Sequence, residues 1–61
     1  MINSQLSTLV LIAYNLDIGN TTPESLKFIH KDQLPKILDF MINEEAKQKL
    51  EDYILIRKLT N

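Results

Sequence analysis

The amino-acid sequence predicts an all-α protein: a single helical domain, residues 1–61, of three or four short helices in a small bundle completed by dimerisation. Two observations predict the helices. Apolar residues recur at helical spacing, and residue types typical of helix ends separate the periodic stretches. A third observation predicts the dimer. A chain of this length buries only about 60% of the surface that its unfolded form exposes, and it has no cysteine to cross-link it.

The first expected helix begins at Asn3 or Ser4, either of which can cap it, and runs to about Ile18. Its apolar residues form two neighbouring stripes, so the helix is apolar around most of its circumference. The main stripe is Leu6, Leu9, Val10, Ala13 and Leu16, and the second is Leu11, Tyr14 and Ile18. A strand over residues 8–14 is the alternative, because the period of so short an apolar run is ambiguous. The length of the segment favours the helix.

The clearest break in the sequence follows this first helix. Gly19 has no Cβ and can therefore close the helix in the left-handed conformation. Thr22 can cap the next helix with Pro23 in its first position, where the missing N–H is not needed. Thr21 and Glu24 also fit a capping box, which would move the start by one residue.

Two short helices are expected in the middle of the chain. The first, of two to three turns, carries Leu26 and Ile29 on its apolar side. Asp32 is expected to cap the second, with Pro35 tolerated in its first turn. The second has the clearest amphipathic pattern in the chain, formed by Leu34, Ile37, Leu38, Met41 and Ile42.

The last expected helix begins after Asn43 and runs to about Leu59. Asn43 is a good cap, and Glu44 and Glu45 suit the positive end of the helix dipole. If this cap does not form, the last two helices would instead fuse into one rod. The apolar stripe is Ala46, Leu50, Tyr53, Ile54 and Arg57. We expect the first and last helices to be adjacent.

The sequence contains no pattern typical of an active site. Its carboxylates lie at expected caps, first turns or polar helix faces, and none are paired at the i, i+3 or i+4 spacing of a carboxylate metal site. The single histidine, His30, is expected at a helix end beside Lys31. One glycine cannot build a phosphate-binding loop. We therefore expect no enzyme, no catalytic residue, no cofactor and no metal.

Net charge and hydropathy limit the kinds of partner that the chain is expected to bind. The net charge of −1 argues against nucleic acid as a partner, since proteins that bind phosphates usually carry a basic excess. The longest apolar run, residues 9–14, is far shorter than the ~20 residues of a membrane span. No signal peptide is visible, which indicates a cytoplasmic protein.

Six large apolar residues fall off the main stripes of their helices: Leu11, Tyr14, Phe28, Phe40, Leu55 and Ile56. Such residues mark an interaction surface when they are exposed together; the alternative is that they belong to the core. They favour a non-enzymatic protein–protein interaction module, a small regulator, adaptor or inhibitor that occupies a partner's surface and forms a homodimer.

A small helix-turn-helix transcriptional regulator is the alternative function. It would place residues 26–30 before the turn and residues 34–42 as the recognition helix, near Lys27, Lys31 and Lys36. The turn lacks the small residue typical of this motif, and the second helix is mostly apolar. The pattern therefore favours protein binding over DNA binding.

Overall fold

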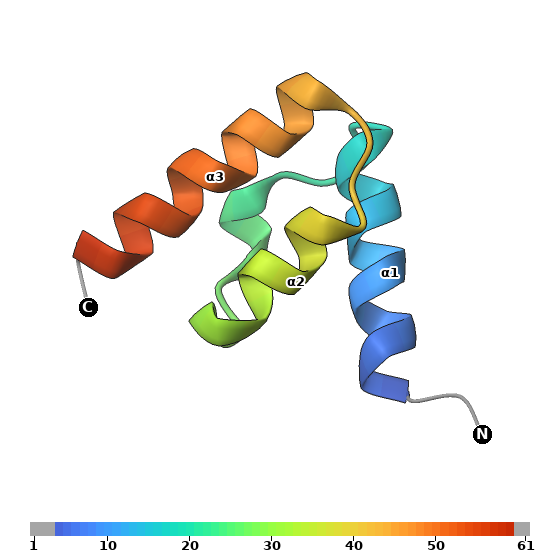
Figure 1. Ribbon diagram of the computed structural model, residues 1–61, viewed down its shortest axis with the longest axis horizontal. Coiled ribbons are helices and arrows are strands. Elements are labelled where there is room, and N and C mark those ends of the chain that lie inside the picture. Colours follow the sequence, from blue (N-terminus) through green and yellow to red (C-terminus); the bar gives the residue numbers. More distant parts are fainter. Residues whose placement is uncertain (1–3, 60–61) are drawn as a thin grey trace.

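A computed structural model of the chain describes residues 4–59 (Figure 1). Over this range the elements are α1 (Ser4–Asp17), the 3₁₀ turns η1 (Pro23–Leu26) and η2 (Lys31–Gln33), α2 (Leu34–Asp39) and α3 (Glu44–Leu59). The predicted all-α fold is confirmed. Residues 8–14 are helical, so the strand alternative is wrong.

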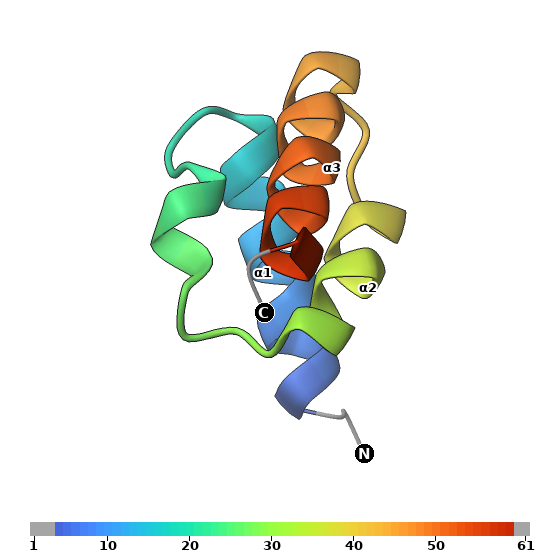
Figure 2. The ribbon, with the colours of Figure 1, turned by 90° about the vertical axis from the view of Figure 1, so that its left-hand side faces the viewer.

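The helices enclose one apolar core. α2 packs against both α1 and α3, and α1 also contacts α3, as expected from the sequence. Figure 2 shows α3 crossing in front of α1, with α2 beside both of them. Every long element contributes to the core, whose buried residues are Leu9, Ala13, Leu16, Leu26, Leu34, Ile37, Met41 and Leu50.

The first helix ends as the sequence predicts, and it buries one side. Gly19 follows it with a φ of 76°, the left-handed conformation that glycine adopts without strain. Leu9, Ala13 and Leu16 of the expected main stripe are buried, whereas Leu6 and Val10 are exposed. The cap expected at Asn3 or Ser4 lies outside the described residues and side chains.

The segment after Thr22 is less helical than predicted. Thr22 has the extended backbone of a cap and Pro23 takes the first position, but one 3₁₀ turn ends at Leu26, so the prediction of two to three turns is wrong. The Ser25 hydroxyl donates to the Thr22 carbonyl at 2.6 Å, which is the acceptor that an α-helical Leu26 N–H would use. Such local side-chain bonds compete with helix formation.

The sequence predicted Asp32 as the cap of the next segment, and this prediction is wrong, because the cap is His30. The Nδ1 atom of His30 accepts a hydrogen bond from the Asp32 backbone N–H at 3.1 Å. The chain then passes through η2 into α2, with Pro35 in the first turn as expected. His30 is therefore a helix-end residue with a capping role.

The helix α2 is shorter than its apolar pattern predicts. Leu34, Ile37 and Met41 are buried and Leu38 is half-buried, but Ile42 is 83% exposed. Ile42 was expected on the apolar stripe, and this prediction is wrong because the helix ends at Asp39. The backbone N–H of Ile42 instead donates to the Asp17 carboxylate, at 3.1 Å to either oxygen.

The break before α3 is confirmed. The side-chain oxygen of Asn43 accepts from the backbone N–H groups of Glu45 at 3.0 Å and Ala46 at 3.2 Å, so Asn43 is the predicted cap. The predicted stripe faces the bundle, with Leu50 fully buried and its other members half-buried. Near the other end of α3, Arg57 Nη1 donates to the Ile29 carbonyl at 2.6 Å.

Candidate interaction surfaces

The six predicted interface residues are all exposed. Their exposed fractions run from 41% for Phe40 to 76% for Phe28. None of them belongs to the buried core, so the alternative that they are core residues is wrong. Whether they contact a partner stays a prediction, and their arrangement decides which of them can act together.

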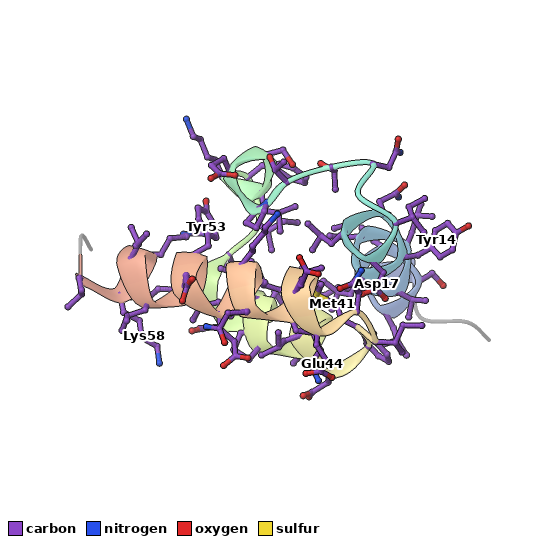
Figure 3. All side chains as sticks on the ribbon, turned by 90° about the horizontal axis from the view of Figure 1, so that it is seen from above. Tyr14, Asp17, Met41, Glu44, Tyr53 and Lys58 are labelled. Atoms are coloured by element: carbon purple, nitrogen blue, oxygen red, sulfur yellow. The ribbon has the colours of Figure 1, made fainter. Side chains whose placement is uncertain are left out.

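The structure separates these residues into distinct surfaces. Tyr14 lies at one end of the long axis of the molecule and Lys58 at the other (Figure 3). Leu11 and Tyr14 therefore lie far from Leu55 and Ile56, which belong to the last turns of α3. A single compact contact cannot include all four residues of one chain.

The first surface covers the outer side of α1. A shallow hollow there is lined by Leu6, Ser7, Val10, Leu11 and Tyr14. Ile18, just beyond the helix, is 57% exposed and lies on the same predicted stripe as Leu11 and Tyr14. We call Ser7, Val10, Leu11, Tyr14 and Ile18 the α1 face.

The α1 face carries no formal charge. Residues 4–16 contain no Asp, Glu, Lys, Arg or His. Asp17 is the single charged residue of α1, and its carboxylate accepts backbone N–H groups of Ile42 and Asn43. The outer side of this helix therefore offers apolar and neutral polar groups to a partner.

Leu55 and Ile56 are neighbours in sequence but line different grooves, because successive residues of a helix point about 100° apart. Leu55 lines a groove between α2 and α3 with Pro35, Leu38, Glu51, Ile54 and Lys58. Ile56 lines another groove between η1 and α3 with Thr22, Pro23, Glu24, Lys49, Asp52 and Tyr53. Both grooves mix apolar side chains with charged ones.

The two phenylalanines lie apart from these surfaces. Phe28 borders a hollow formed with α1 and the loop that follows it, lined by Ile12, Asn15, Asn20, Thr21, Ser25 and Leu26. Phe40 is the C-cap residue of α2. The structure therefore does not bring the six predicted residues together at one site.

Sequence reasoning missed several exposed apolar residues. Ile18 shares a stripe with Leu11 and Tyr14, so the helical period alone could have added it to the surface. Val10 was assigned to the core side, because a 3.6-residue period does not show how wide the buried side is. Ile42 and Leu59 are 83% and 78% exposed, and Ile42 was assigned to an apolar stripe of a longer helix.

A polar cluster holds the α1 face in place relative to the rest of the bundle. The Asp17 carboxylate accepts from the backbone N–H groups of Ile42 at 3.1 Å and Asn43 at 3.0 Å. In return, the Asn43 side-chain amide donates to the Asp17 carbonyl at 3.1 Å. These bonds join the end of α1 to the start of α3, a connection that local sequence patterns do not show.

The described residues contain no group of three or more His, Cys, Asp or Glu side chains placed to hold a metal ion. His30 is exposed, and its Nδ1 atom also lies 3.5 Å from the Asp32 carboxylate. Gln33 Oε1 is buried without a hydrogen-bond partner, at the junction of η2 and α2.

The helix-turn-helix alternative is not matched by the middle of the chain. The expected first helix is a single 3₁₀ turn, and α2 has six residues. Two of those six, Leu34 and Ile37, are fully buried. Residues 26–42 therefore do not form the pair of helices that this reading requires.

Comparison with known proteins identifies no relative: no family model matches the chain, and no curated protein or solved structure is significantly similar to it. Within residues 4–59, no helix is long and apolar enough to cross a membrane.

Proposed function

We propose that the chain is a non-enzymatic protein–protein interaction module of the cytoplasm. It acts as a small regulator, adaptor or inhibitor by occupying a surface of a partner protein, and it also associates with itself. The observation that carries this proposal is the α1 face, where exposed apolar side chains lie on one side of a helix with no formal charge among them. Contiguous apolar patches on small proteins mark contacts with other proteins.

The energetics of the α1 face support binding. Each large aliphatic or aromatic side chain that moves from water into a contact contributes about 1.5–3 kcal/mol. Leu11 and Tyr14 are 60% and 59% exposed, so much of this gain is still available to a partner. Tyrosine is also common among residues that dominate binding energy, because its ring buries a large area and its hydroxyl tolerates water.

The grooves along α3 are a second candidate contact. They combine apolar side chains with Lys and Glu or Asp at their borders. Mixed surfaces of this kind suit a partner with complementary charges, since charged borders favour correct partners and repel wrong ones. We expect a different protein to bind here, whereas the uncharged α1 face suits a partner that is itself uncharged.

The test is affinity capture from a lysate of the organism that encodes the chain, with three matched baits beside the wild type. Leu11→Glu places a charge on the α1 face and Leu55→Glu places one in the α2–α3 groove. Gln48→Glu places the same charge on an exposed part of α3 and removes no apolar side chain. Circular dichroism first verifies that each bait is folded.

We expect a protein that the wild type and Gln48→Glu retain, and that one of the two leucine variants loses. Retention through the α1 face should survive high salt, because apolar contacts are not screened by ions. Equal capture by all four baits would contradict the proposal. So would a captured species that proves to be nucleic acid and is released by salt.

A further inference from the structure

The outer side of α1 carries a stripe with symmetric spacing. Ser7, Leu11, Tyr14 and Ile18 follow one another at intervals of four, three and four residues. Residues at this spacing lie along one side of a helix, as in the contact seam of a coiled coil. This side lies opposite the buried one formed by Leu9, Ala13 and Leu16, so the stripe faces away from the bundle.

We propose that a second copy of this chain covers the α1 face, with the two α1 helices antiparallel and a two-fold axis passing between Leu11 and Tyr14. The inference rests on the proposed function in one respect, that exposed apolar surfaces of this chain are contacts. It adds the partner, the surface and the orientation. It also leaves the α2–α3 groove accessible for a different protein.

The spacing of the stripe argues for a second copy. Intervals of four, three and four read the same in both directions, so an antiparallel copy presents an identical stripe in full register. Leu11 then faces the partner's Tyr14, and Ser7 faces the partner's Ile18. Each pairing sets a larger side chain against a smaller one, which is how facing layers interdigitate. A closed two-fold contact is also the commonest form of homo-oligomer.

The absence of charged side chains on the α1 face also supports a second copy as its partner. A two-fold contact places a surface against itself, so charges near the axis meet charges of the same sign and must be offset by others. The α1 face avoids this cost, because residues 4–16 include no charged side chain. The carboxylate of Asp17, at the end of the helix, is bound to the N–H groups of Ile42 and Asn43.

The length of α1 limits the size of this contact. A helix of 14 residues is about 21 Å long, which is short for a standard interface of roughly 800 Å² per partner. We therefore expect a dimer that dissociates in the micromolar range.

The first experiment measures the association itself. Sedimentation equilibrium of the wild type at several concentrations should show a monomer–dimer equilibrium. Tyr14→Glu should raise the dissociation constant at least tenfold, because the two-fold axis brings two new carboxylates near each other. Tyr14→Phe, Leu55→Glu and Gln48→Glu should change it less than threefold. A wild type that stays monomeric at high micromolar concentration overturns the inference, as does a dimer that Leu55→Glu disrupts and Tyr14→Glu does not.

The monomeric outcome separates this inference from the proposed function. If a monomeric wild type still captures a protein that Leu11→Glu loses, the proposed function stands and the α1 face belongs to another partner. If the dimer forms as proposed and no protein is captured differentially, the dimer stands and the adaptor role fails.

The second experiment measures the relative orientation of the two α1 helices and does not depend on a variant that disrupts the dimer. The chain has no cysteine, so every disulfide that forms must join introduced cysteines. Ser7→Cys and Ile18→Cys lie about 16 Å apart along one helix, and a disulfide needs Cα atoms roughly 4.4–6.8 Å apart. On mild oxidation of an equal mixture, mass spectrometry should find the mixed disulfide in large excess over either symmetric one. A parallel pair of helices would give the two symmetric disulfides instead. The control is a mixture of Leu55→Cys and Gln48→Cys, which should give the statistical distribution expected from random collision. Symmetric products, or a distribution equal to that of the control, would overturn the inference.

Discussion

The helices α1 and α3 have similar lengths and both leave large apolar side chains exposed, yet they present different surfaces. α3 contains eight charged residues among its sixteen, whereas α1 contains one among its fourteen. The exposed Leu55 and Ile56 of α3 line separate grooves with charged borders. On α1, Leu11 and Tyr14 line the same hollow. Continuity and the absence of charge, more than the number of exposed apolar residues, therefore distinguish a candidate contact.

The two helices also differ in how they are attached to the bundle. α1 contributes three buried apolar residues, Leu9, Ala13 and Leu16, whereas α3 contributes the buried Leu50 and three partly buried residues packed against the core, Ala46, Tyr53 and Ile54. Polar contacts near both of its ends also attach α3. Asn43 and Asp17 bond to each other's chain segments at one end, and Arg57 bonds to the Ile29 carbonyl near the other.

The largest effect is expected for the one fully buried side chain of α3. Leu50→Ala should lower the free energy of unfolding by about 2–5 kcal/mol, through lost burial and a cavity. For so small a chain this is comparable to the whole stability. Urea denaturation followed by circular dichroism measures it. Leu55→Ala, on the exposed side of the same helix, is the control and should cost less than about 1 kcal/mol. Equal losses would show that the orientation of α3 is wrong.

Asp17→Ala should have the next largest effect. The change leaves the backbone N–H groups of Ile42 and Asn43 without their carboxylate acceptor, at a cost of about 1–3 kcal/mol. Because these bonds join α1 to the start of α3, hydrogen exchange should rise at Ile42 and Asn43 and not in the middle of α1. Asp39→Ala, which removes an exposed carboxylate at the end of α2, is the matched control. A loss of stability no greater than that control would contradict the role of Asp17.

The Asp17 contacts also show where sequence reasoning ends. Caps and periodicity predicted α1, its glycine stop, the Asn43 cap and the inner side of α3, because each depends on residues within a turn or two of one another. The N–H groups of Phe40 and Met41 bond to carbonyls three residues earlier, whereas the N–H of Ile42 bonds to Asp17, 25 residues away. Ile42 fits the local apolar pattern, yet α2 ends at Asp39, and the local pattern does not show the distant acceptor of the Ile42 N–H.

For the candidate surfaces, the sequence predicted which residues are exposed but not how they are distributed. Helical phase correctly placed Leu11, Tyr14, Leu55 and Ile56 outside the core, because a helix buried on one side must expose the other. Their distribution over separate surfaces could not be predicted, since it depends on how the helices cross. Phe28 lies next to η1, where the sequence predicted a longer helix. Its position therefore had no reliable helical phase.

The cap of α3 gives a smaller effect that is confined to one helix. Asn43→Ala should cost about 0.5–2 kcal/mol, because the N–H groups of Glu45 and Ala46 lose their acceptor. Asn43→Ser retains a capping oxygen and should recover most of this loss. Thermal unfolding followed by circular dichroism compares the two variants. If Asn43→Ser is as unstable as Asn43→Ala, the bond from the Asn43 amide to the Asp17 carbonyl matters more than the cap.

The smallest expected effect is that of salt on self-association, and it separates the two helices most directly. If α1 forms the dimer contact, no charged side chain among residues 4–16 enters it. The dissociation constant should then change less than twofold between 50 and 500 mM sodium chloride. A contact through α3 would bring its eight charged residues close to those of the partner, and screening of these charges would shift the constant several-fold. Sedimentation equilibrium across this range tests both possibilities, with Leu55→Glu as an internal control. That variant adds a charge to α3 alone, so it changes the salt dependence if α3 is the contact and leaves it unchanged if α1 is.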